Sequence, residues 1–167
     1  MIMHMKKIVL IFFVIMISLK GFSQFDTTAP YFKDKVLPKF SLLSIDSVYF
    51  TQAVLKENKN TILMLFNPDC EHCQKQTELF LSMAELPELA QLVMFTIETQ
   101  EKNKAFYDKY HLEKYPFIYF GRDYKYFCLT YFKPTTIPLL VFYNKKNELV
   151  AVKQGNIKKE DILDILK

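Results

Sequence analysis

TILMLFNPDCEHCQ, residues 61–74, joins an apolar strand pattern to a pair of cysteines. It opens with the apolar run TILMLF (61–66), which polar residues bound on both sides, as expected of a strand buried on both faces of a sheet. From Cys70 the sequence reads as a helix, which Pro87 is expected to end. The apolar side of this helix consists of Leu79, Phe80, Met83 and Ala84. A buried strand, a short loop and a helix beginning at a Cys-x-x-Cys pair therefore follow one another.

Several chemistries use such a cysteine pair, and the neighbouring residues disfavour most of them. A c-type haem site requires histidine directly after the second cysteine, whereas Gln74 follows Cys73 here. A peroxidatic cysteine has a threonine three residues ahead and a proline further back, but Pro68 lies only two residues before Cys70. Zinc requires four ligands. The additional candidate ligands, none of them at ligand spacing, are His72, His111 and Cys128.

A redox dithiol explains the position of the pair as well as its spacing. A helix that starts at Cys70 places the first sulfur beside unpaired backbone N–H groups, and these groups and the helix dipole favour the thiolate. Cys73 lies one turn further along on the same side, close enough to resolve a mixed disulfide. A protonated His72 favours the Cys70 thiolate further and Glu71 opposes it, so we assign both a tuning role.

Outside this stretch, strand patterns alternate with helix patterns. Strands are expected at 40–45, 47–50, 91–98, 138–144 and 148–155, a short extended piece at 116–120, and helices at 101–112, 123–131 and 156–167. Asp123 is the expected N-cap of the second of these helices. Strand–helix alternation followed by a closing strand pair and a helix predicts an α/β sandwich with a mixed sheet.

The remaining cysteine and histidine candidates have ordinary structural explanations. Cys128 falls on an apolar stripe with Tyr124, Phe127 and Tyr131, so we expect a buried, inert thiol, the alternative being a second resolving cysteine. His111 follows a polar helical segment and is expected on the surface.

The N-terminus has the order of a secretory signal peptide. Basic residues precede a ten-residue apolar run, IVLIFFVIMI (8–17), and small residues follow it at Gly21 and Ser23. A membrane span needs about 17–25 apolar residues, so an uncleaved anchor is the weaker alternative. Cleavage after residue 23 removes three lysines and no acid, which lowers the formal net charge from +4 to +1. The mature chain therefore carries no basic patch for nucleic acid.

Three segments of the chain together resemble the thioredoxin-like fold, and within it the exported TlpA/redoxin branch of thiol–disulfide oxidoreductases. They are TILMLFNPDCEHCQ (61–74), TTIPLLVFYNKKNELV (135–150) and KQGNIKKEDILDIL (153–166). The resemblance runs from about residue 38 to the C-terminus. It implies a three-layer α/β/α sandwich with a mixed central sheet, and a helical segment inserted at about 99–132. It also implies that Ile137 and a cis Pro138 face the dithiol and bind an extended substrate chain.

The chain departs from the family pattern at three positions near the dithiol. Thioredoxin has tryptophan before the first cysteine, where this chain has Asp69. Met64 and Gln76 stand where thioredoxin and some exported relatives place acids that deprotonate the second cysteine. The resemblance therefore implies a dithiol enzyme without the usual proton acceptors.

We expect residues 1–23 to be a signal peptide, 24–37 an irregular lead-in and 38–167 a thioredoxin-like domain. The implied function is exchange of disulfides with exported proteins, more as reductant than as oxidant, in the periplasm. The cycle needs a redox partner protein and neither a bound cofactor nor a metal. Membrane contact is expected only if the N-terminal segment stays uncleaved. The alternative is a thioredoxin-like binding module whose dithiol takes no part in catalysis.

Overall fold

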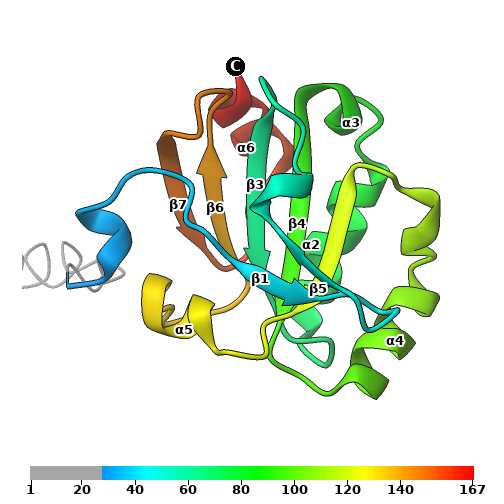
Figure 1. Ribbon diagram of the computed structural model, residues 1–167. Coiled ribbons are helices and arrows are strands. Elements are labelled where there is room, and N and C mark those ends of the chain that lie inside the picture. The colour runs from blue at the N-terminus through cyan, green and yellow to red at the C-terminus, as the bar shows by residue number, and fades with distance from the viewer. Residues whose placement is uncertain (1–27) are drawn as a thin grey trace, which may run out of the picture.

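The computed structural model describes residues 28–167, which form a mixed seven-stranded sheet in the order β2-β1-β5-β4-β3-β6-β7 (Figure 1). The strands are β1 (Ser41–Leu43), β2 (Tyr49–Thr51), β3 (Asn60–Leu65), β4 (Ala90–Thr96), β5 (Ile118–Arg122), β6 (Leu139–Tyr143) and β7 (Leu149–Gln154). β3, β4 and β5 are parallel, whereas β6 is antiparallel to both β3 and β7. The predicted signal peptide and residues 24–27 of the lead-in lie outside the described residues.

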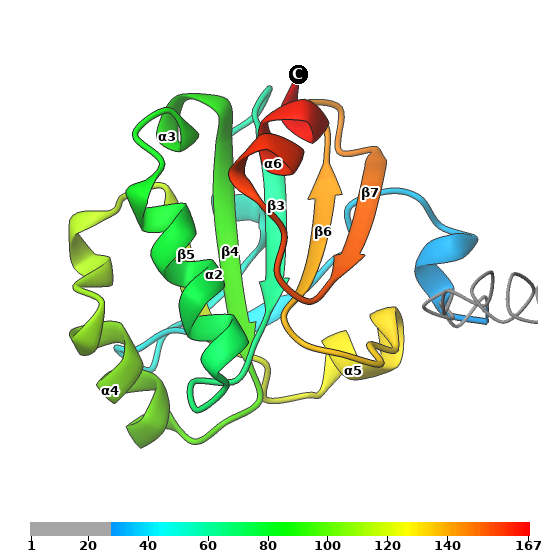
Figure 2. The same ribbon diagram turned by 180° about the vertical axis from the view of Figure 1, so that it is seen from behind.

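Helices cover both faces of this sheet. They are α2 (Glu71–Ser82), α3 (Leu86–Leu89), α4 (Gln100–Lys109), α5 (Phe127–Phe132) and α6 (Lys159–Leu166). Figure 2 shows α2 and α6 in front of the sheet. These two helices and α4 contribute to one buried cluster, and α5 and the 3₁₀ turn Pro30–Phe32 contribute to the other. The predicted α/β/α sandwich with a mixed sheet is therefore confirmed.

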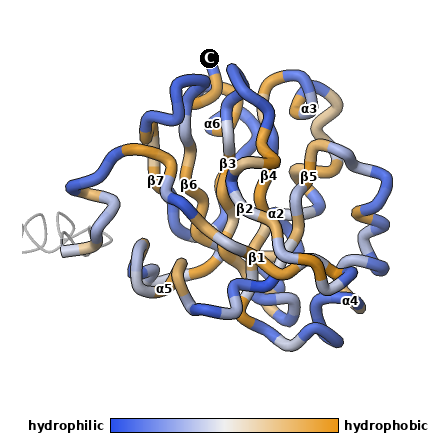
Figure 3. The backbone as a smooth tube through the Cα atoms, in the orientation of Figure 1, coloured by the Kyte–Doolittle hydropathy of each residue, from blue (hydrophilic) through white to orange (hydrophobic). Residues whose placement is uncertain are grey.

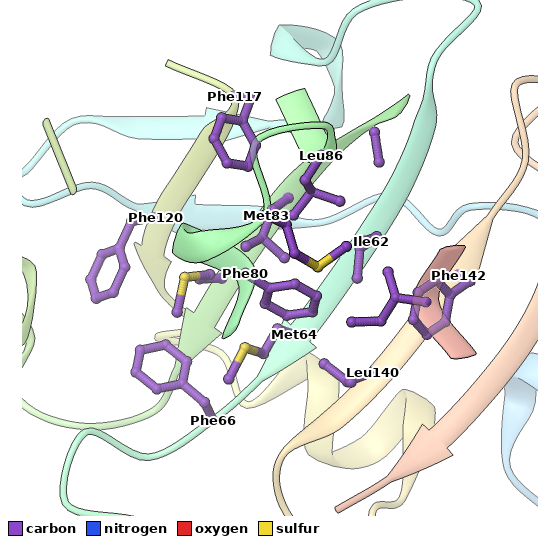
Figure 4. Close-up of a cluster of buried hydrophobic side chains, with 14 of the residues drawn as sticks. Ile62, Met64, Phe66, Phe80, Met83, Leu86, Phe117, Phe120, Leu140 and Phe142 are labelled. Atoms are coloured by element: carbon purple, nitrogen blue, oxygen red, sulfur yellow. The ribbon is translucent and has the colours of Figure 1, made fainter. Parts of the chain in front are cut away.

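Every residue of β3 is buried, which places this strand at the centre of the core. Its side chains alternate between the two clusters, with Ile62 and Met64 on one face and Leu63 and Leu65 on the other. Phe80 and Met83 lie over Ile62 and Met64 (Figure 4). Figure 3 shows the same arrangement as hydrophobic residues along the central strands and hydrophilic ones in many of the connecting turns. The prediction that the run 61–66 contains a strand buried on both faces of the sheet is therefore confirmed.

Buried polar side chains join the amino ends of β3 and β4. The Nδ2 of Asn60 donates to the carbonyl oxygens of Leu89 and Leu166, both at 3.1 Å. The Nε2 of Gln91 donates to the hydroxyl of Thr61 at 3.0 Å. Each of these side chains finds a partner, as buried polar groups must.

Some element boundaries differ from the sequence-based prediction. α2 ends at Ser82, and Pro87 lies in the first turn of the separate short helix α3 rather than marking the end of α2. Proline fits there because the first turn of a helix does not use its N–H groups. The inserted segment 99–132 also contains β5, so the prediction of a helical insertion is incomplete. β5 pairs with β4 over five residues, from Leu92↔Ile118 to Thr96↔Arg122.

Within residues 28–167 no helix is both long enough and apolar enough to cross a membrane.

Candidate dithiol site

Cys70 is the N-cap of α2. Its Sγ accepts a hydrogen bond from the backbone N–H of Cys73 at 3.4 Å, and its side chain is partly buried. The turn before it is held by Asn67, whose side-chain oxygen accepts from the Asp69 N–H at 2.8 Å and whose carbonyl accepts from the Cys70 N–H at 3.1 Å. A sulfur in this position receives the free N–H groups of a helix start, which favour negative charge.

Cys73 lies behind Cys70 and has no exposed surface. Burial first, and then its hydrogen bond with Cys70, raises the pKa of the Cys73 thiol to about 12. The two thiols are therefore unequal, since one is accessible at the start of the helix and the other is buried and protonated at neutral pH.

Charged residues next to the pair are already matched with partners. The Glu71 carboxylate accepts from the Lys75 ammonium at 2.6 Å, and this hydrogen bond lowers the pKa of Glu71. The Asp69 carboxylate pairs in the same way with Lys102 of α4 at 2.6 Å. Both pairs are solvent-exposed, so each reduces the negative charge at the helix start without adding much stability.

The topology brings three loops to the same edge of the sheet. β3 is antiparallel to β6, and Leu65 pairs with Leu139, so the loop after β3 and the peptide before β6 lie side by side. β7 is antiparallel to β6, so its carboxyl end reaches the same edge, where the Gly155 N–H donates to the Pro138 carbonyl at 2.8 Å. This is the lower edge in Figure 2, at which α2 begins. The predicted residues 70–73 and 137–138 thus belong to one region.

The peptide bond between Ile137 and Pro138 is cis. Ile137 packs against both hydrophobic clusters; Cys73 belongs to one of them, and Cys70 packs against that same cluster.

Sequence reasoning missed the contribution of the loop after β7. Asn156 bonds to His72 twice: its Nδ2 donates to the His72 carbonyl at 2.6 Å, and its Oδ1 lies 2.9 Å from the imidazole Nδ1. Beside it, the Ile157 N–H donates to the Oε1 of Gln76 at 2.9 Å. The direction of β7 was the available signal, because a strand parallel to β3 must end at the edge that holds the dithiol.

The positions that lack the family's acids are buried. Met64 has no exposed surface and is part of the core, and Gln76 is 1% exposed. The Gln76 Nε2 has no hydrogen-bond partner among the described residues. Neither residue supplies a carboxylate beside Cys73.

Cys128 lies on the opposite face of the sheet from the Cys70–Cys73 pair, and the prediction that it is buried is confirmed by an exposure of 1%. Burial, followed by the nearby Asp123 carboxylate, raises the pKa of its thiol. His111 is exposed, as expected. Within residues 28–167 no three His, Cys, Asp or Glu side chains are grouped to hold a metal ion.

No protein-family model matches this sequence, and no curated protein matches it. Several solved structures, in contrast, are similar to this protein. StoA from Bacillus subtilis matches with a TM-score of 0.57 and 20% identity, covering 80% of this chain and 99% of that one. A secreted disulfide oxidoreductase from Mycobacterium tuberculosis, described as homologous to Escherichia coli DsbE, gives a TM-score of 0.62 and 17% identity, over 76% and 93% of the chains. A proposed thioredoxin from Neisseria meningitidis gives 0.62 and 19%, over 78% and 86%.

At these identities the similarity defines the fold. The protein is an α/β protein with the thioredoxin-like fold, as its sequence predicted, and its Cys-x-x-Cys pair begins the helix that follows the central strand.

Proposed function

We propose that this protein is a thiol–disulfide oxidoreductase of the exported TlpA/redoxin type. The observation that carries the proposal is the inequality of the two cysteines. Cys70 is partly accessible and caps α2 with its sulfur, whereas Cys73 is fully buried one turn behind it. An attacking thiolate needs access and N–H groups around it, and a resolving thiol must stay protonated until a mixed disulfide forms.

In the reductant direction, the Cys70 thiolate attacks one sulfur of a client disulfide and the other client sulfur leaves. Cys73 then attacks the Cys70 sulfur of the mixed disulfide, which forms the Cys70–Cys73 bond and releases the second client sulfur. The departing client thiolate takes up the proton that Cys73 loses. Two electrons pass from the protein dithiol to the client, and a partner protein with a dithiol reduces the Cys70–Cys73 bond again.

The other parts of the proposal follow from the resemblance of the sequence to the exported TlpA/redoxin branch. Residues 1–23 act as the signal peptide, 24–37 as the lead-in and 38–167 as the redox domain, which works in the periplasm. Ile137 and Pro138 bind the client backbone beside the dithiol, since they lie at the edge where α2 begins. Glu71 and His72 tune the thiolate. The clients are exported proteins with a reducible disulfide.

Mixed-disulfide trapping tests this function. Cys73→Ser keeps the attacking thiol and removes the resolving one, so it is expected to accumulate client conjugates that dithiothreitol releases. Cys128→Ser is the matched control, because its thiol is buried on the other face, and it is expected to trap nothing and to retain exchange. Absence of conjugates with Cys73→Ser would contradict the proposal.

The reduction potential gives the direction of exchange. The protein is equilibrated with glutathione or dithiothreitol buffers and the oxidised fraction is measured. A value near roughly −270 mV makes it a reductant, and one near roughly −120 mV makes it a disulfide donor.

A binding module is the second candidate function. Exposed apolar side chains lie beside and on α5, where Tyr124 is 57%, Tyr126 51% and Leu129 36% exposed, and the acids that assist Cys73 in relatives are missing. A pair that never exchanges in either buffer would favour this candidate.

A further inference from the structure

Asn156 connects two parts of the dithiol edge that are far apart in the sequence. It follows β7, whereas His72 lies between the two cysteines in the first turn of α2. The Nδ2 of Asn156 donates to the His72 carbonyl at 2.6 Å and its Oδ1 lies 2.9 Å from the His72 Nδ1. One amide side chain thus contacts both the backbone and the imidazole of the same histidine.

This double contact fixes the orientation of the amide. Only an NH₂ group can donate to the His72 carbonyl, so the Nδ2 must face that carbonyl and the Oδ1 must face the ring. An amide oxygen accepts and cannot donate, so the ring nitrogen facing it must carry a proton. Neutral His72 is therefore protonated at Nδ1 and has its lone pair at Nε2.

A neighbouring contact holds the loop that carries Asn156. The N–H of Ile157 donates to the Oε1 of Gln76 at 2.9 Å, and Gln76 is almost completely buried in α2. The Gly155 N–H is bonded to the Pro138 carbonyl on the other side. Asn156 is thus fixed on both sides, although it is itself exposed.

The charged groups near His72 and its partner Asn156 come from α2 and from the start of α6. On α2, Glu71 is paired with Lys75 at 2.6 Å. From the other element, Lys158, Lys159 and Glu160 line the groove that Asn156 and Lys75 also line, and Lys159 is paired with Glu85 at 2.5 Å. The imidazole is hydrogen-bonded to the neutral amide of Asn156. Glu71 also interacts electrostatically with His72, but its carboxylate is paired with Lys75.

We propose that Asn156 is a positioning residue of the dithiol site, which holds the His72 ring in place and keeps the neutral imidazole in the Nδ1–H form. The charge of His72 then acts on Cys70 from one defined position two residues along the helix start. A positive charge near a cysteine at a helix start generally favours the thiolate. This role rests on the proposed function, in which Cys70 is the attacking thiolate.

The first measurement is the ¹⁵N NMR spectrum of the His72 ring in the full chain, which distinguishes a protonated from an unprotonated ring nitrogen. The wild-type protein is expected to show Nδ1–H when neutral. Asn156→Ala is expected to lose this preference, and Asn156→Asp, which keeps an acceptor oxygen, is expected to retain it. A wild-type ring protonated at Nε2 when neutral would overturn the proposal.

The second measurement is the rate at which iodoacetamide alkylates Cys70 in the reduced protein between pH 5 and pH 8. Asn156→Ala and His72→Gln are each expected to slow the reaction at pH 6 by roughly three- to tenfold, since alkylation requires the thiolate and a nearby cation favours that form. In His72→Gln the further change Asn156→Ala is expected to have no effect. An equal loss in both backgrounds would show plain structural support by Asn156 and overturn the proposal.

Neither measurement requires a client. If the ring and the alkylation behave as expected but the protein exchanges no disulfide, the proposed function fails, and Asn156 then positions His72 beside Cys70 without serving disulfide exchange. If the protein exchanges disulfides but Asn156→Ala leaves His72 and Cys70 unchanged, the positioning role fails alone.

Discussion

Two helices of this protein begin next to a cysteine, and they begin in opposite ways. At the start of α2 the sulfur of Cys70 accepts the backbone N–H of Cys73 at 3.4 Å. At the start of α5 the carboxylate of Asp123 takes that place, accepting from the N–H of Phe127 at 3.0 Å and of Cys128 at 2.7 Å. The N–H groups stabilise a sulfur in one helix and an acid in the other.

The difference shows that a helix start does not by itself make a cysteine reactive. Cys128 lies within the first turn of α5, but its own N–H is bonded to a carboxylate. Burial in the core, and then that carboxylate, raises the pKa of its thiol. At the start of α2, by contrast, the sulfur of Cys70 itself accepts the N–H of Cys73, and the side chain is partly accessible to solvent. The acceptor at the helix start therefore separates a candidate redox thiol from a core thiol.

Removing the carboxylate at α5 is expected to have the largest effect on stability. Asp123 is 1% exposed and bonds to two N–H groups, so Asp123→Ala leaves both without a partner and is expected to lower the free energy of unfolding by about 2–3 kcal/mol. Urea denaturation measures this free energy in the wild-type protein and in the variant. Asp108→Ala, at an exposed acid of α4 that pairs with Lys104, is the control and should change the free energy of unfolding by less than about 0.5 kcal/mol. Equal stabilities of the two variants would show that Asp123 does not cap α5.

The buried thiols are expected to make the reduced protein less stable in alkali. The pKa of Cys73 is raised from 9.0 to about 12, so the folded state holds a proton that the unfolded state loses. The protonated Cys73 thiol therefore contributes to the free energy of unfolding. This contribution is complete below pH 9 and is lost as the pH rises toward 12, with a slope of up to about 1.4 kcal/mol per pH unit for one group.

Urea denaturation under reducing conditions at pH 8 to 11 tests this slope. Cys73→Ser is expected to flatten the fall because serine does not titrate there. Cys128→Ser is expected to flatten it too, since the pKa of that thiol is also raised. An unchanged slope in both variants would contradict the assignment of buried, protonated thiols.

The exposed charges beside Cys70 are expected to have the smallest effect. Glu71 is paired with Lys75, so Glu71→Gln removes a carboxylate whose field is already partly cancelled, and Cys70 alkylation at neutral pH should accelerate by less than about twofold. Lys75→Gln frees the charge of Glu71 and should slow it. If Glu71→Gln and Lys75→Gln both accelerated or both slowed the alkylation of Cys70, these charges would not act on Cys70 directly.

The central part of the fold could be predicted from the sequence because its signals are local. The run 61–66, the helix from Cys70 and the closing strand pair each have a characteristic period or turn. β5 was underestimated as a short extended piece, since its residues are only partly apolar and its pairing with β4 is a long-range contact. The end of α2 was misplaced because Pro87 suits a helix start as well as a helix end.

The site was predicted in part for the same reason. The cysteines, Glu71 and His72 are adjacent in the sequence, and Ile137–Pro138 stands out by its motif. Asn156 is a single polar residue in a loop, and only the return of β7 to the dithiol edge gives it a partner. The N-cap assignment of Asp123 was correct in chemistry but not in position, because Tyr126 is the residue that directly precedes α5.

The hydrogen bonds of Asn60, Thr61 and Gln91 have a consequence for the opposite end of the molecule. A sheet that is apolar on both faces gains little from one alignment of its strands over another, since a shift of one residue exchanges one apolar set for another. Such a shift would move β3 by about 3.3 Å and carry Cys70 away from Pro138. The polar side chains at the amino ends of β3 and β4 oppose this shift because it would leave them unpaired in the core. They therefore fix the depth at which the dithiol emerges beside its proposed substrate loop.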